Sequence, residues 1–199
     1  MAITSIKTGS SFTNLVKYND FLGPNSAYIP SSYESIASVT ATGGETSFTF
    51  SGIAGTYASL QIRGLSRRNT TGGHIVGVRF NGDTGANYVN HYLRAVNNVG
   101  IQAVGTTGED FIRCFSAAST SAGSNIFGTG IIDIHDYASS TKNTTVRSFG
   151  GYDDNNTTNN VLGLQSGLWL NTNAITSVTI YFNTDAVAAG STFALYGIK

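Results

Sequence analysis

The sequence of 199 residues has little charge, because 11 lysines and arginines balance only 11 aspartates and glutamates. Charged residues make up 11% of the chain, against about 25% in a typical soluble protein. This balance does not favour electrostatic capture of nucleic acid or of an anionic membrane. A soluble protein with so few charges often hides part of its surface in an assembly. The composition therefore favours a protein that works through interfaces.

Cysteine and long apolar runs are also scarce. Cys114 is the single cysteine, which excludes an intramolecular disulfide and a thiol-rich metal site. We expect it to be a small buried residue on a strand. No segment approaches the roughly 20 apolar residues of a membrane-spanning helix. The first residues, M-A-I-T-S-I-K-T, do not resemble a signal peptide, so we expect synthesis in a cytoplasm without secretion by that route.

Proline is confined to one end of the chain, at Pro24 and Pro30. Because proline cannot donate a hydrogen bond to a β-ladder, this distribution predicts an irregular N-terminal arm over residues 1–33 and a β-domain over residues 34–199. The arm carries many apolar residues, so we expect it to lie against its own domain, a neighbouring subunit or a larger scaffold. The arm residues that we expect to make assembly contacts are Leu15, Tyr18, Phe21, Leu22 and Tyr28.

From residue 35 onward, short segments of alternating apolar and polar residues recur, each closed by glycine, asparagine, serine or threonine. In one of them, Val178 and Ile180 alternate with polar neighbours. We expect strands at 35–41, 46–51, 57–65, 74–80, 87–95, 110–115, 127–137, 144–150, 161–170, 175–182 and 192–198. Many short strands with frequent turns predict an all-β sandwich or barrel.

The segment N-G-D-T-G at residues 81–85 lies between two predicted strands. Asn-Gly tolerates positive φ, and between two alternating runs it predicts a β-hairpin, here with a loop that Asp83-Thr84-Gly85 lengthens beyond two residues. The tripeptide Asp83-Thr84-Gly85 also matches the motif of aspartic proteases, whose chemistry needs two carboxylates that share a proton. The sequence holds one copy, so we favour a turn in which the aspartate accepts local hydrogen bonds.

Other residue types that support catalysis or metal binding do not form a recognisable pattern. His74, His91 and His135 lack the spacing of a zinc site, and Ser166 lacks the glycine of a nucleophile elbow two positions before it. The loop at 153–156 offers oxygen ligands without the spacing of a calcium-binding EF-hand. We therefore predict no catalytic residue, no metal site and no cofactor.

Two groups of residues are candidates for contacts with other molecules. Arg67 and Arg68 lie in the one local cluster of basic residues, and we expect them to form ion pairs with another subunit or molecule. The rings of Tyr88, Tyr92 and Tyr152 are open candidates for contact with a glycan, since tyrosine presents an apolar ring with a polar end.

Three segments of the β-domain stand out: F-T-F-S-G-I-A-G-T-Y-A-S-L-Q-I-R-G at 48–64, V-R-F-N-G-D-T-G-A-N-Y at 78–88 and G-S-T-F-A-L-Y-G-I-K at 190–199. Together they resemble segments of a family of tailed-bacteriophage virion proteins. The segment P-S-S-Y-E-S-I-A at 30–37 resembles the lead-in of the same proteins. Members of this family are capsid decoration or cement proteins, head fibres or tail-fibre modules. The resemblance implies a jelly-roll sandwich that is often trimeric.

These observations lead to one set of expectations. We expect an all-β, two-sheet antiparallel jelly-roll-like sandwich of about ten to eleven strands with an extended N-terminal arm. The expected function is a non-enzymatic virion protein that decorates or cements the capsid as a homo-oligomer, in contact with the major capsid protein or other virion proteins and without nucleic acid, membrane or cofactor. The alternative is a tail-fibre or receptor-binding module that contacts host glycans, and an enzyme ranks third.

Overall fold

The computed structural model describes residues 32–71, 74–97, 99–154, 160–183 and 185–199. The chain divides into two units, Met1–Ser32 and Tyr33–Lys199, and the second is the β-domain. The predicted arm and its five proposed contact residues lie outside the described residues, apart from Ser32 and Tyr33 at its end.

The described residues form twelve strands and no helix. In chain order they are β1 (Tyr33–Thr40), β2 (Ser47–Ser51), β3 (Ser59–Ser66), β4 (His74–Phe80), β5 (Tyr88–Val96), β6 (Gly100–Glu109), β7 (Ile112–Ala117), β8 (Gly128–His135), β9 (Thr144–Tyr152), β10 (Val161–Trp169), β11 (Ser177–Tyr181) and β12 (Thr192–Ile198).

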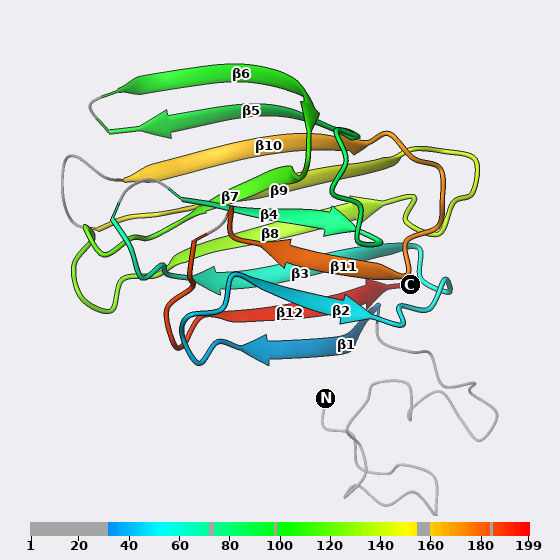
Figure 1. Cartoon of the computed structure of the whole chain (residues 1–199), viewed down its shortest axis with the longest axis horizontal. Coiled ribbons are helices and arrows are strands. Elements are labelled where there is room, and N and C mark those ends of the chain that lie inside the picture. The colour runs from blue at the N-terminus through cyan, green and yellow to red at the C-terminus, as the bar shows by residue number, and fades with distance from the viewer. Residues whose placement is uncertain (1–31, 72–73, 98, 155–159, 184) are drawn as a thin grey trace, which may run out of the picture. The chain divides into compact units, whose positions relative to one another are not determined.

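The strands form two antiparallel sheets with jelly-roll connectivity. The order is β1-β12-β3-β8-β9-β10-β5-β6 in the eight-stranded sheet and β2-β11-β4-β7 in the four-stranded sheet. Leaving aside the hairpins β5–β6 and β9–β10, the remaining strands alternate between the sheets except at β4 and β7, which pair within the smaller sheet. The strands β1-β12-β3-β8 face β2-β11-β4-β7, which is the arrangement of two Greek keys. The hairpins β9–β10 and β5–β6 extend the larger sheet, and β5 and β6 lie beyond the edge of the smaller one (Figure 1).

The predicted two-sheet sandwich is confirmed, and each of the eleven expected strands lies within about two residues of an observed one. The strand that the sequence did not reveal is β6. It is an edge strand with a single neighbour, β5, and its sequence G-I-Q-A-V-G-T-T-G-E lacks a clear apolar face. Because an edge strand outside the core buries little surface, it needs no strict alternation of apolar and polar residues.

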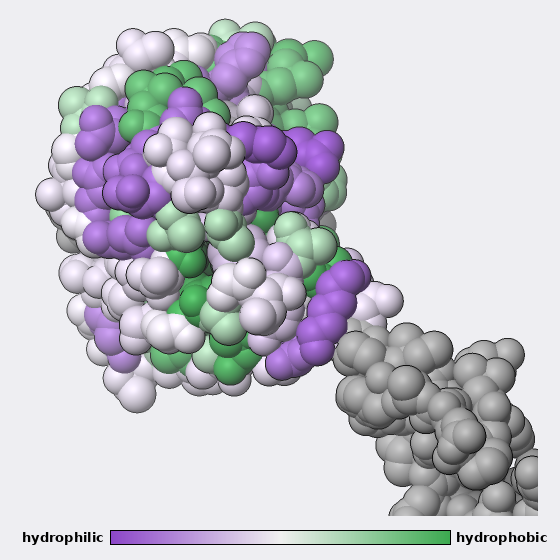
Figure 2. All heavy atoms as spheres, turned by 90° about the vertical axis from the view of Figure 1, so that its right-hand side faces the viewer, coloured by the Kyte–Doolittle hydropathy of each residue, from purple (hydrophilic) through white to green (hydrophobic). Residues whose placement is uncertain are grey.

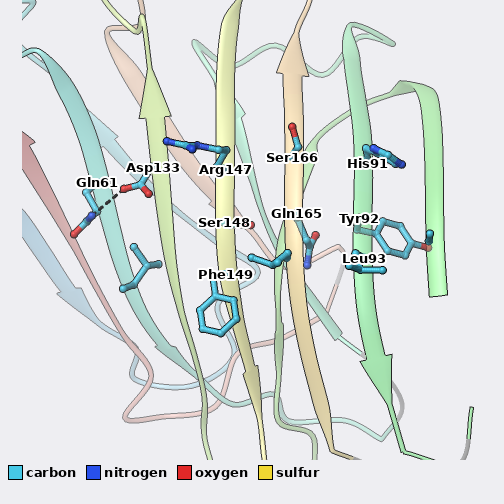
Figure 3. A pocket seen from close by; sticks show the side chains of 13 residues that line it. Gln61, His91, Tyr92, Leu93, Asp133, Arg147, Ser148, Phe149, Gln165 and Ser166 are labelled. Carbon is cyan, nitrogen blue, oxygen red and sulfur yellow. Dashed lines mark hydrogen bonds between the residues drawn. The ribbon is translucent and has the colours of Figure 1, made fainter. Parts of the chain in front are cut away.

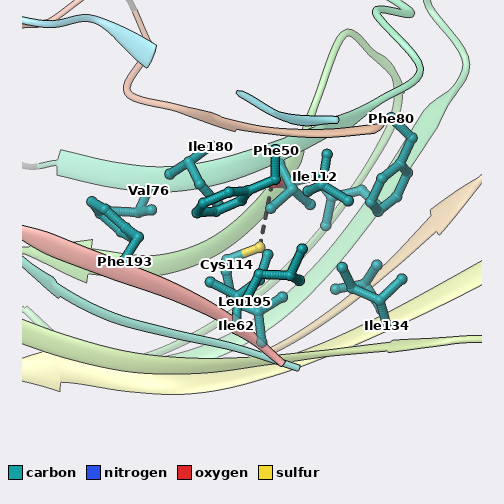
Figure 4. Packing of buried hydrophobic residues seen from close by; sticks show 14 of the residues in the cluster. Phe50, Ile62, Val76, Phe80, Ile112, Cys114, Ile134, Ile180, Phe193 and Leu195 are labelled. Atoms are coloured by element: carbon teal, nitrogen blue, oxygen red, sulfur yellow. Dashed lines mark hydrogen bonds between the residues drawn. The ribbon is translucent and has the colours of Figure 1, made fainter. Parts of the chain in front are cut away.

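The core lies between the two sheets, where apolar side chains from both interleave (Figure 4). Ile62, Ile134 and Leu195 come from the larger sheet, and Phe80 comes from the smaller one. Cys114 on β7 has no exposed surface, as the sequence predicted, and burial raises the pKa of its thiol. The end of the β-domain that Figure 2 shows carries many pale residues of intermediate hydropathy between hydrophilic and hydrophobic groups.

Strand β7 packs onto a row of glycines in the larger sheet. Gly64, Gly130 and Gly150 stand directly opposite one another on β3, β8 and β9, and we call them the glycine row. The ring of Phe115 lies on this row, and a Cβ atom built on Gly130 would come within 2.3 Å of it. Larger residues at these positions would therefore push β7 away from the sheet.

We expect Gly130→Ala to lower the free energy of unfolding by about 1–3 kcal/mol, because the added methyl group overlaps the ring of Phe115. Gly105→Ala is the matched control, since a Cβ atom at that position would meet its nearest neighbour at 3.6 Å. Urea denaturation followed by the fluorescence of Trp169 measures both variants. Equal stability of the two variants would contradict a tight contact between β7 and the glycine row.

Candidate functional site

The tripeptide Asp83-Thr84-Gly85 lies in the connection between β4 and β5. Asn81 and Gly82 adopt positive φ values of 50° and 70°, as an Asn-Gly reversal requires. The backbone N–H of Gly85 donates to Oδ1 of Asp83 over 2.8 Å, so the carboxylate closes the turn locally. The prediction of a turn is confirmed, but the prediction of a β-hairpin is wrong, because β4 and β5 lie in different sheets and do not pair.

The carboxylate of Asp83 also connects this turn to the core. The indole N–H of Trp169 donates to Oδ2 of Asp83 over 2.8 Å, and Asn87 donates to the same carboxylate. Burial disfavours the charged form of Asp83, but the hydrogen bonds that it accepts, first of all from Trp169, outweigh this effect and hold its pKa below the ordinary value. Both oxygens of the carboxylate are thus engaged in structural hydrogen bonds.

Tyr88 has no exposed surface, so its assignment as a glycan contact is wrong. Its ring stacks on that of Trp169 with centroids 6.4 Å apart, and its hydroxyl donates to the main-chain oxygen of Asp83 over 3.0 Å. Burial raises the pKa of Tyr88 to about 12. Tyr88 and Trp169 stand opposite each other on β5 and β10, and this register, which the sequence does not reveal, turns both rings into the core.

Tyr92 and Tyr152 are half-buried on β5 and β9. The ring of Tyr92 lies under the guanidinium group of Arg94, 5.3 Å from it, on the opposite face of the strand from the exposed Leu93. Tyr152 follows Gly151 on β9 and pairs with Val161, far along the sheet from Tyr92. The structure therefore does not bring the three tyrosines together.

Arg67 and Arg68 make contacts within the chain instead of facing a partner. The guanidinium group of Arg67 donates to the main-chain oxygens of Gly123 and Ile126 over 2.9 and 2.7 Å. Arg68 is buried and forms an ion pair with Asp185. These contacts correct the expectation of intermolecular ion pairs, and the sequence hid them because the acceptors lie far along the chain.

The remaining candidates for metal binding lie apart. His91 is on β5, His135 ends β8, and Asp153 and Asp154 follow β9; residues 155–159 lie outside the described residues. Within the described ranges, no group of three or more histidine, cysteine, aspartate or glutamate side chains could hold a metal ion. The same part of the chain contains no helix that could span a membrane.

The main surface feature of the described residues is a set of exposed apolar side chains on the larger sheet. They lie on the face that points away from the smaller sheet, which we call the outer face. Six large apolar residues there are between 42 and 79% exposed: Ile131, Phe149, Leu164, Leu162, Leu93 and Ile101. Monomeric soluble proteins rarely expose large contiguous apolar patches, so this face is the strongest candidate for a binding surface.

The outer face is organised in rows that cross the strands (Figure 3). The apolar row consists of residues directly opposite one another on β8, β9, β10 and β5: Ile131, Phe149, Leu164 and Leu93. Two positions further along the same strands lies the polar row: Asp133, Arg147, Ser166 and His91. Gln61 on β3 continues the polar row beyond Asp133.

A shallow hollow of about 800 Å³ lies over both rows. A second hollow of about 500 Å³ lies next to it, where Gly151 places no side chain between Thr129 and Leu162. The face is therefore indented enough to receive side chains or a ligand from outside.

The polar row offers both donors and acceptors of hydrogen bonds. The side-chain amide of Gln61 donates to Oδ1 of Asp133 over 2.8 Å, and a guanidinium nitrogen of Arg147 lies 3.1 Å from Nε2 of His135. One carboxylate and one guanidinium group thus stand on neighbouring strands. These donors and acceptors can form hydrogen bonds with polar groups of another molecule that lie opposite the polar row.

The sequence pointed to none of the residues of the apolar row. A signal was present in β10, V-L-G-L-Q-S-G-L-W, where leucines alternate with Gly163 and Gly167. A large apolar residue is ordinarily assigned to the core, but in this strand the glycines face the core and Leu162 and Leu164 face outward. The alternation of glycine with leucine was the signal that the leucines of this strand face outward.

We expect Asp83→Ala to lower the free energy of unfolding by about 1–3 kcal/mol, because the buried indole N–H of Trp169 loses its acceptor. The contribution of the ionised carboxylate is present above the pKa of Asp83 in the unfolded state, and it is lost as the pH falls through the lower pKa of the folded state. Urea denaturation of wild type and Asp83→Ala at neutral and acidic pH measures this, and the difference between them should shrink on acidification. A difference that does not depend on pH would exclude a role for the carboxylate charge.

Comparison of the whole chain with models of known protein families and with curated proteins gives no match.

Proposed function

We propose that this chain is a non-enzymatic structural protein of a bacteriophage virion, and that it decorates or cements the capsid as a homo-oligomer. The observation that carries the proposal is the exposed apolar outer face on a jelly-roll sandwich. The resemblance of residues 48–64, 78–88 and 190–199 to virion proteins of tailed phages supplies the biological setting.

Physical arguments support a structural role. An apolar face of this size is unfavourable in water and becomes favourable when an assembly covers it. The chain has few charges to keep it soluble as a free monomer. A jelly-roll sandwich with a close-packed core is a rigid body, which suits a protein that must hold its shape on a particle.

A glycan-binding module of a tail fibre is the second candidate function. The observation that favours it is the larger hollow, where the polar row lies beside the exposed ring of Phe149. A sugar ring presents hydroxyl groups at its edge and C–H groups on its face, and these match a polar row next to an aromatic ring. Of the three tyrosines that the sequence suggested as glycan contacts, Tyr92 is among the residues that line this hollow.

Deletion of residues 1–30 should abolish incorporation into virions while the β-domain keeps its thermal unfolding transition. The physical reason is that the arm, which lies outside the described residues, carries apolar side chains suited to clamp a neighbouring subunit or the capsid. Quantitative mass spectrometry of purified particles measures incorporation, with full-length protein as the control. Hundreds of copies per particle fit capsid decoration, whereas a few dozen fit a tail fibre; normal incorporation of the truncated protein would remove the clamp.

If the second candidate function is right, full-length protein should bind immobilised host-surface glycans, and Phe149→Ala should weaken that binding about tenfold or more by removing the ring from the hollow. A glycan array measures the binding. Leu170→Ala is the control, since this residue is exposed to a similar extent beyond the end of β10. Equal binding by the two variants would place any glycan site elsewhere on the chain.

A further inference from the structure

The two faces of the β5–β6 hairpin have inverted polarity. The face on the side of the four-stranded sheet carries Arg94 and Gln102, which share a hydrogen bond of 2.7 Å between Nε and Oε1. The outer face of the same hairpin carries Leu93 and Ile101, which are 48 and 79% exposed. Strands β5 and β6 lie beyond the edge of the smaller sheet, and Arg94 and Gln102 are only half-buried. Exposed apolar side chains are unfavourable in water, so a partner that covers the outer face of this hairpin would be favoured.

We propose that a second copy of this chain covers the outer face, in a dimer with its two-fold axis parallel to the strands and between β9 and β10. This inference deepens the proposed function and rests on it in one respect, since it identifies the surface through which the homo-oligomer forms. Two sheets packed in this way form an aligned sandwich, with side chains of the two outer faces interdigitating.

The register of the strands makes the outer face complementary to itself under this symmetry. Rotation about an axis parallel to the strands keeps each row at its own level, so the apolar row meets the apolar row and the polar row meets the polar row. Strand β9 then lies over the partner's β10, which places Phe149 on Leu164 of the second copy. Strand β8 lies over the partner's β5, which places Ile131 on Leu93 of the second copy. Because the contact is isologous, each pair occurs twice.

The charges of the polar row also favour an axis between β9 and β10. With the axis between β9 and β10, the carboxylate of Asp133 on β8 faces His91 on β5 of the second copy, and Arg147 on β9 faces Ser166 on β10. An axis through β10 itself would instead place Arg147 opposite His91. A two-fold axis perpendicular to the strands would set the polar row against apolar residues or each polar residue against itself. An axis between β8 and β9 would also pair Asp133 with a base, Arg147, but it would set Leu164 of the apolar row against Arg63 on β3 of the second copy. The position between β9 and β10 pairs Asp133 with His91 and also keeps the four residues of the apolar row against one another.

The size of the face suits a stable dimer. Six strands, from β3 to β6, span about 24 Å at roughly 4.8 Å per step, and strands of nine residues are about 30 Å long. The footprint is then about 700 Å², close to the roughly 800 Å² per partner of a standard interface. Desolvation of the apolar row supplies the driving force, and the hollow of about 800 Å³ receives side chains of the second copy.

Sedimentation velocity of the full-length protein over a range of concentrations tests the proposal. Wild type should form a dimer, and Leu164→Glu should raise its dissociation constant about tenfold or more, because it puts a charge against Phe149 of the partner. The matched control is Leu170→Glu, at a leucine of similar exposure beyond the end of β10, which should dimerise like wild type. Circular dichroism and thermal unfolding check that each variant is folded.

A mixing experiment tests the symmetry itself. Asp133→Lys alone should weaken the dimer by setting a lysine against His91, and His91→Asp alone should weaken it by setting two aspartates against each other. A mixture of the two variants should dimerise again, because one new contact pairs lysine with aspartate and the other restores the original aspartate and histidine. Local damage to either subunit cannot produce this rescue.

The outcomes separate this inference from the proposed function. A monomeric wild type at all concentrations, a trimer of the kind that the family resemblance implies, a dimer insensitive to Leu164→Glu, or a mixture without rescue would each overturn the two-fold outer-face dimer. A trimer or an insensitive dimer would leave a homo-oligomeric virion protein standing. Conversely, an outer-face dimer that is absent from purified particles would support the interface and overturn the capsid function.

Discussion

The close approach of β7 to the eight-stranded sheet is the constraint on which the rest of the structure depends. The ring of Phe115 lies on the glycine row, and the side chain of Ile112 lies against Gly167 on β10 in the same way. A Cβ atom at any of these glycines would come within 3 Å of Phe115 or Ile112 on β7, and at Gly150 it would also overlap the main-chain oxygen of Thr129. Strand β7 can approach β8, β9 and β10 closely because glycines on these strands lie against its side chains.

This packing also explains the unusual outer face. Side chains alternate between the two faces of a strand, so the residues on either side of an inward-facing glycine point outward. On β10 the outward residues are Leu162 and Leu164, and on β9 Phe149 stands next to Gly150. On β9 and β10, inward-facing glycines thus alternate with outward-facing apolar residues. The proposed assembly would bury the apolar surface that folding leaves exposed to water.

The Asp83 turn shows how a motif with catalytic associations serves the fold. Its carboxylate joins the β4–β5 connection to Trp169 at the end of β10, and so it helps to hold the β5–β6 extension against the body of the sandwich. Three donors, from Gly85, Asn87 and Trp169, engage this carboxylate, so its oxygens stabilise the turn and its link to the core. The polar side chains that a partner could contact lie instead in the polar row of the outer face.

The sequence alone determined the fold class, the positions of eleven strands, the turn at Asn81-Gly82 and the burial of Cys114. These properties follow from local alternation, turn residues and composition, which act over a few neighbouring residues. Tertiary structure decided the rest: that β6 exists at an edge, that Tyr88 lies under Trp169, that Arg67 binds a loop far along the chain, and that the leucines of β10 face outward. Each depends on strand register and on which face meets the other sheet, and a one-residue shift of register would turn every side chain to the opposite face without changing the local pattern.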